Sequence, residues 1–240
     1  MALKAGWMPT LLQQIDWGCA TSRLISGILT GVENDQALFR GRQLCINLWP
    51  FIKELPENIR LVRDALPESM EAAKKLLSQL ADDERYYQKL YIKQCELSGL
   101  TEDDLNSADI DETAKPIRDV MRKYCRSGDY RDGILAVVTA ELAATAFSRT
   151  ALPVYERYFA ENNDRFGKQK VEDGLEWLRI HAKPQTRNAL WLIRMLSDIT
   201  NQEDGVPVPV ADMLSALFSV WNCPKSDTIP SHGLVAERVH

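Results

Sequence analysis

Residues 175–199, LEWLRIHAKPQTRNALWLIRMLSDI, form the stretch around which the rest of the chain is organised. Apolar side chains occupy nearly every helical face of this stretch, which is typical of a buried helix. His181 shares one helical face with Gln185 and Asn188, because these positions are spaced i, i+4 and i+7. A buried polar group without a partner costs about 1 to 3 kcal/mol. We therefore expect the three side chains to share a hydrogen-bond network, a ligand or a metal.

The other periodic segments are also helical and predict an all-α, single-domain helical bundle. Helices are expected at residues 20–29, at 36–65 with kinks at Pro50 and Pro56, at 70–100, after Asp111, at 133–159 and at 211–221. No stretch alternates with period two over more than a few residues. The helical content should reach about 60%, well above the usual third. Residues 1–222 are expected to form the domain, and residues 223–240 a tail that is either disordered or clamped to it.

Composition excludes several classes of partner. The 240 residues carry a net charge of −5 with acidic and basic residues interspersed, so neither a nucleic-acid surface nor a polybasic membrane patch is indicated. The five cysteines are scattered and form no CxxC motif, which argues against a zinc site and against disulfides. The longest apolar run, residues 133–147, is too short to span a membrane, and no signal peptide is visible. We expect a soluble cytoplasmic protein whose partner is a small molecule.

Glu141 is the only charged residue in the apolar segment ILAVVTAELAATAF, residues 134–147. A buried carboxylate must be protonated, ion-paired or bound to a cation, and such shifted groups mark functional sites more often than chance. The alternative is a structural ion pair with Arg187 or Arg194.

Glu84 interrupts an apolar seam of an expected long helix. The seam is spaced by 3, 4, 3 and 4 residues and consists of Leu77, Leu80, Glu84, Tyr87 and Tyr91. This spacing places all five on one face. Because Glu84 follows Asp82 and Asp83, the alternative is a solvated acidic turn. For His181 the alternative is a hydrogen-bonded core histidine.

Two carboxylates and a histidine on three apolar helices resemble the heme-oxygenase-like superfamily, which holds TenA-type thiaminases, PqqC and CADD-like diiron oxygenases. The resemblance covers most of the chain. CELSGL at residues 95–100 is similar to the AEALGL of those proteins, and an Ala-rich helix carries one glutamate, here Glu141. Their late motif, His-x3-Asp-x2-His-Ala-Leu, reads here as His181, Gln185 and Asn188 followed by Ala-Leu.

The resemblance implies a diiron-type ligand set that is incomplete in this chain. It would carry over onto Glu84, Tyr91, Glu141, His181, Gln185 and Asn188. Only Glu84, Glu141 and His181 can ligate a metal, so iron or manganese would bind at these three if any metal binds, and no cofactor is certain. Pro184 also departs from the pattern, because it can break the helix between His181 and Gln185. A thiaminase would need a cysteine near Glu141, and a heme oxygenase a histidine near the N-terminus; the chain has neither.

The resemblance implies a central pocket for a small organic molecule and an oxidoreductase of the oxidase or oxygenase type, with an incomplete or absent metal site. Glu84, Glu141 and His181 would then be acid–base groups or residual ligands. The residues expected to contact substrate are Tyr87, Tyr91, Gln185 and Asn188. The alternative is a non-catalytic member of the same fold that binds a metabolite or a partner protein. The superfamily also makes a homodimer the expected assembly.

Overall fold

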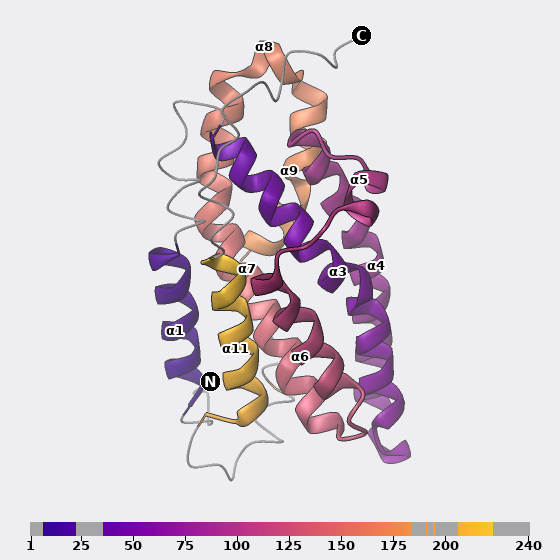
Figure 1. The fold of residues 1–240 in the computed structure, drawn as a ribbon. Coiled ribbons are helices and arrows are strands. Elements are labelled where there is room, and N and C mark those ends of the chain that lie inside the picture. The colour runs from indigo at the N-terminus through magenta and orange to yellow at the C-terminus, as the bar shows by residue number, and fades with distance from the viewer. Residues whose placement is uncertain (1–6, 23–35, 184–190, 192–193, 195–205, 223–240) are drawn as a thin grey trace.

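The computed structural model describes residues 7–22, 36–183, 191, 194 and 206–222, and all of their regular secondary structure is helical (Figure 1). The elements are α1 (Met8–Thr21), α3 (Gln36–Ala65), η2 (Glu68–Met70), α4 (Glu71–Leu97), α5 (Glu102–Ser107), η3 (Glu112–Ala114), α6 (Lys115–Cys125), α7 (Tyr130–Glu161), α8 (Asn163–Phe166), α9 (Lys168–Ala182) and α11 (Val208–Trp221). The prediction of an all-α bundle is confirmed for these residues.

The long helices form two connected groups. α3 packs against α4. α9 packs against both α4 and α7 and so connects these two helices in the core. α6, α7 and α11 contact one another, and α1 packs on α7 beside α11 (Figure 1). The described residues of the expected site lie on α4, α7 and α9.

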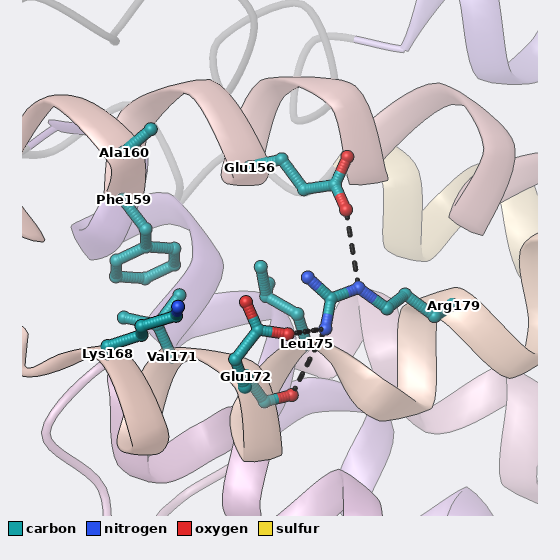
Figure 2. Close-up of a pocket in the computed structure, with 8 residues that line it drawn as sticks. All are labelled: Glu156, Phe159, Ala160, Lys168, Val171, Glu172, Leu175 and Arg179. Carbon is teal, nitrogen blue, oxygen red and sulfur yellow. Dashed lines mark hydrogen bonds and ion pairs between the residues drawn. The ribbon is translucent and has the colours of Figure 1, made fainter.

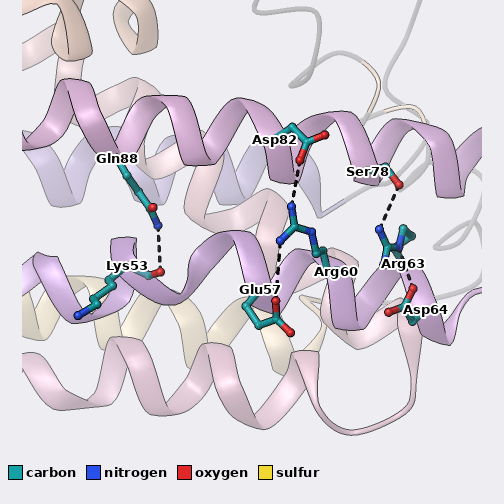
Figure 3. A network of polar contacts seen from close by, with 8 residues as sticks. All are labelled: Lys53, Glu57, Arg60, Arg63, Asp64, Ser78, Asp82 and Gln88. Carbon is teal, nitrogen blue, oxygen red and sulfur yellow. Dashed lines mark hydrogen bonds and ion pairs between the residues drawn. The ribbon is translucent and has the colours of Figure 1, made fainter.

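α3 continues through both of its prolines, as the sequence predicts. A proline at position 56 removes the N–H that would bond to the carbonyl of Ile52, four residues earlier. The side chain of Gln88 on α4 supplies the missing donor, because its Nε2 lies 2.8 Å from Ile52 O and 2.9 Å from Lys53 O. The contact with Lys53 is drawn in Figure 3. The partner helix therefore satisfies the backbone group that the proline frees.

α4 and α9 cross closely at Gly174. A Cβ at this position would lie 2.4 Å from Leu97 Cδ1 and 2.5 Å from Leu97 Cγ, so a larger residue would force the helices apart. Beyond Leu97, α4 ends with Gly99 at φ +74°, in the left-handed region. Glycine adopts this conformation without a steric penalty, which makes it a favoured residue just after a helix.

Two expected boundaries need correction. α9 ends at Ala182, and Lys183 is extended at ψ 123°, because the residue before a proline avoids the helical region. The helix expected through residues 175–199 is therefore not continuous, and residues 184–190 lie outside the described part. The described part also contains a helix that was not expected, α1, which has Pro9 in its first turn; residues 23–29 of the helix expected at 20–29 lie outside the described residues. α11 begins at Val208, three residues earlier than expected, because Pro209 in its first turn favours the start of a helix.

Among the described helices, α7 is the one that is long and apolar enough to cross a membrane. Most of that apolar stretch is buried against other helices of the bundle. Its apolar character is thus explained by its place in the core, in which Ala136, Val137 and Ala143 are almost completely covered.

Candidate functional site

Glu84 points into the bundle although it ends an acidic run. Asp82, two residues earlier, is exposed and pairs with Arg60 of α3 at 2.9 Å (Figure 3). Glu84 is only 5% exposed, and within the described part of the chain its Oε1 has no hydrogen-bond partner. Burial raises the pKa of this carboxyl well above its usual range, and the nearby charges of Glu141 and Asp83 raise it further. The raised pKa favours the protonated, neutral form of Glu84 over the charged form.

Glu141 lies half-buried on α7. Burial raises the pKa of its carboxyl to about 7. Among the described residues no lysine or arginine forms an ion pair with Glu84 or Glu141. Of the two arginines considered from the sequence, Arg187 lies outside the described residues, and Arg194 lies over the ring of Trp191 at 5.7 Å. The two carboxyls thus act on each other with no described cation between them.

His181 lies in the last turn of α9 with its imidazole buried. Its Nδ1 is 2.8 Å from the backbone oxygen of Trp177. A carbonyl oxygen can only accept, so Nδ1 carries the proton and Nε2 is left as an acceptor. Burial lowers the pKa of the imidazole to about 4. At neutral pH His181 is therefore an uncharged base, held in one tautomer by its own helix.

Tyr87 links the other three groups. Its ring meets the His181 ring edge-on, with centroids 5.1 Å apart. Burial raises the pKa of its phenol to about 12, and the charges of Asp83, Glu84 and Glu141 add to the effect. Tyr87 is therefore a protonated donor close to both carboxyls and to the histidine. Tyr87 thus contacts His181, and the charges of Glu84 and Glu141 act on its phenol; all four residues were expected from the sequence, and their catalytic and binding roles stay predictions.

Tyr91, one turn further along α4, lies in a different environment. It is 2% exposed and is packed between two tryptophans, with ring centroids 6.5 Å from Trp49 and 5.3 Å from Trp177. Its hydroxyl donates to the backbone oxygen of Cys45 at 3.4 Å. Of the two tyrosines on the seam, Tyr87 is therefore the one that contacts His181. Gln185 and Asn188 lie outside the described residues.

Two residues of this region were not singled out from the sequence. Trp177 stacks on His181 with centroids 4.2 Å apart, a contact that the i, i+4 spacing could have indicated. Asn58 on α3 is buried, and its Oδ1 has no hydrogen-bond partner among the described residues. The pairing of Arg60 with Asp82, and of Gln88 with Ile52, sets the register of the two helices and places Asn58 level with Glu84. The sequence alone contains no signal for Asn58, because its place level with Glu84 depends on how α3 pairs with α4.

The described side chains do not fit iron or manganese. Within the described ranges, no three His, Cys, Asp or Glu side chains lie close enough together to hold one ion.

A pocket of about 230 Å³ lies between α7 and α9, away from these residues (Figure 2). Arg179 closes one side of it by bridging Glu156 at 3.3 Å and Glu172 at 2.5 Å. Phe159 and Leu175 line the pocket, and none of the expected site residues does. The central pocket expected from the sequence is thus not this one.

Two solved structures are similar to this chain. A TenA homolog from Pseudomonas syringae pv. tomato str. DC3000 matches with a TM-score of 0.71, 92% of this chain and 91% of that one being covered at 14% identity. A domain of unknown function with a heme oxygenase-like fold from Shewanella denitrificans OS217 matches with a TM-score of 0.50, 89% of each chain being covered at 14% identity. No protein-family model matches the sequence, and no curated protein does. The chain therefore has the heme-oxygenase-like fold that the sequence motifs predict; identity this low establishes the fold alone.

Proposed function

We propose that this chain binds a small organic molecule beside Tyr87 and oxidises it, using Glu84, Glu141 and His181 as acid–base groups. The observation that carries the proposal is the position of Tyr87. Its ring contacts His181, and the charges of Glu84 and Glu141 raise the pKa of its phenol. Three titratable groups with shifted pKa values around one side chain are more frequent in functional sites than elsewhere, although structural networks also produce them. We further propose that the protein acts in the cytoplasm and as a homodimer.

The pKa shifts give each of the three acid–base groups a different role in the proposed reaction. Glu141, with a pKa of about 7, can both accept and return a proton at neutral pH. The raised pKa of Glu84 favours its protonated form, which can donate a hydrogen bond to an oxygen or nitrogen of the substrate. His181 offers a lone pair on Nε2. In the proposed reaction the substrate gives up two protons, the first of them to Glu141, and passes two electrons one at a time to dioxygen, so that a hydroperoxyl radical forms before hydrogen peroxide.

The second candidate is a non-catalytic protein that binds the same molecule. It is favoured by the lack of a three-donor metal group among the described residues, since that removes the commonest way of activating oxygen. On this reading the same four side chains provide specificity through hydrogen bonds.

Native mass spectrometry of the purified chain, followed by identification of any co-purified molecule, tests binding. Oxygen consumption and peroxide release with that molecule then separate the two candidates. We expect Glu141→Gln to abolish turnover while retaining binding, and Glu96→Gln, a change at an exposed glutamate of the same bundle, to preserve both. Binding without oxygen consumption would leave the non-catalytic candidate. Binding that is unchanged in Glu84→Gln, Glu141→Gln and His181→Gln would place the ligand elsewhere and refute the proposed site.

A further inference from the structure

A continuous series of aromatic rings leads from the site into the α3–α4 interface. Tyr87 contacts His181, His181 stacks on Trp177 at 4.2 Å, and Trp177 meets Tyr91 edge-on at 5.3 Å. Tyr91 then lies parallel to Trp49 at a centroid distance of 6.5 Å, with an angle of only 2° between the rings. Neighbouring rings are thus in or near van der Waals contact over the whole series.

The two ends of the series differ. At one end Tyr87 lies beside Glu84 and Glu141, and next to it the ring of Tyr86, at 6.0 Å, is 54% exposed. At the other end the indole N–H of Trp49 donates to Oδ1 of Asn106 at 2.9 Å, and Asn106 is exposed. Oδ1 of Asn106 also accepts from Nζ of Lys53 at 2.8 Å, and because both of these side chains are exposed, the far end of the series lies next to solvent.

The composition of the series is selective. It contains tyrosine, tryptophan and histidine but no phenylalanine. Another ring cluster of this protein, formed by Tyr155, Tyr158, Phe159 and Phe166, does include phenylalanine. Packing alone accepts phenylalanine, whereas the loss of one electron at moderate potential requires an indole or a phenol. In this series, every position that must lose an electron is occupied by tryptophan or tyrosine, as electron transfer requires.

We propose that Tyr87, His181, Trp177, Tyr91 and Trp49 form a one-electron relay between the carboxylate site and the surface at Asn106. A hydroperoxyl radical that has not received its second electron takes one from Tyr87 and becomes a hydroperoxide anion, while the phenolic proton of Tyr87 passes to the ionised form of Glu141. Trp177 reduces the Tyr87 radical through the His181 ring, and the proton returns. The hole passes from Trp177 to Trp49 across the ring of Tyr91, which acts as a tunnelling bridge and keeps its phenolic proton, and Trp49 then releases its N–H proton to solvent beside Asn106.

The relay rests on the proposed function for its natural oxidant, but it can be tested without substrate. Tyr86→Cys, in a Cys223→Ser background, provides an exposed attachment point next to Tyr87 for a ruthenium polypyridyl photo-oxidant; the four described native cysteines are buried. Flash–quench oxidation should produce a tryptophan radical in transient absorption, and oxidation products at Trp49 in peptide mass spectrometry. We expect Trp177→Phe to lower Trp49 oxidation at least about tenfold, and Tyr91→Phe, which keeps the ring and the packing, several-fold.

Trp17→Phe is the matched control, because Trp17 is 64% exposed on α1 and contacts none of these rings. It should leave oxidation of Trp49 unchanged. Circular dichroism and urea melts check that each variant is folded, and Tyr91→Phe decides the matter if Trp177→Phe is not. Trp49 oxidation that is equal in wild type, Trp177→Phe and Tyr91→Phe, or absent in the wild type, would overturn the relay. A working relay in a protein that oxidises no substrate would refute the proposed function alone.

Discussion

Replacing Glu141 by glutamine should make the protein more stable at pH 8 and change it little at pH 5. In the folded chain the pKa of Glu141 is about 7, against an ordinary value of 4.5. Between these pH values the unfolded chain has released a proton that the folded chain still holds. The stability present below pH 4.5 is therefore lost as the pH rises towards 7.

The magnitude follows from the pKa values. One pKa unit corresponds to about 1.4 kcal/mol, so Glu141 should cost the wild type about 2.5 kcal/mol of unfolding free energy between pH 5 and pH 8. Glutamine has nearly the same shape and does not titrate, so the variant escapes this loss without leaving a cavity. The difference between the two proteins isolates Glu141, because the other titrating groups are common to both.

Urea melts of wild type and Glu141→Gln at pH 5 and pH 8 measure the difference. The variant should gain on the wild type by about 2.5 kcal/mol at the higher pH. Glu96→Gln, at an exposed position, should show no such gain. A buried ion pair or bound cation at Glu141 would reverse the sign, with the variant losing about 3 to 5 kcal/mol at pH 8, and that result would refute the reasoning.

Three further outcomes are expected. The imidazole of His181 should keep its neutral, Nδ1-protonated ¹⁵N NMR signature from pH 8 to pH 5, because burial lowers its pKa to about 4. For the same reason wild type should lose stability relative to His181→Gln as the pH falls from 6.5 towards 4, and a titration midpoint of the imidazole near 6.5 would contradict this. Gly174→Ala should cost about 1 to 3 kcal/mol in urea melts, because its Cβ would overlap Leu97 at 2.4 Å; an unchanged midpoint would mean that α4 and α9 are not in this close contact. Elemental analysis after expression with iron or manganese should find less than about one ion per chain, and Gln185→Asp combined with Asn188→His should raise metal affinity; two tightly held ions in the wild type would contradict the expectation.

Helical periodicity alone was enough to predict the fold class and the direction of several side chains. The seam through Leu77, Glu84 and Tyr87 faces inward as its spacing requires, and Gly99 ends α4 where a left-handed residue is needed. The motifs around Glu141 and His181 predicted the heme-oxygenase-like fold, which comparison with solved structures supports.

Tertiary structure decided which of these inward faces meet. That Tyr87 rather than Tyr91 contacts His181 depends on how α9 crosses α4 at Gly174, and no local pattern encodes that crossing. Glu84 and Glu141 lie 57 positions apart in the sequence, and only the packed bundle shows that the charge of Glu141 raises the pKa of Glu84. The helical period determines on which face of its own helix a residue lies. Which other helix packs against that face is set by contacts between segments that are distant in the chain.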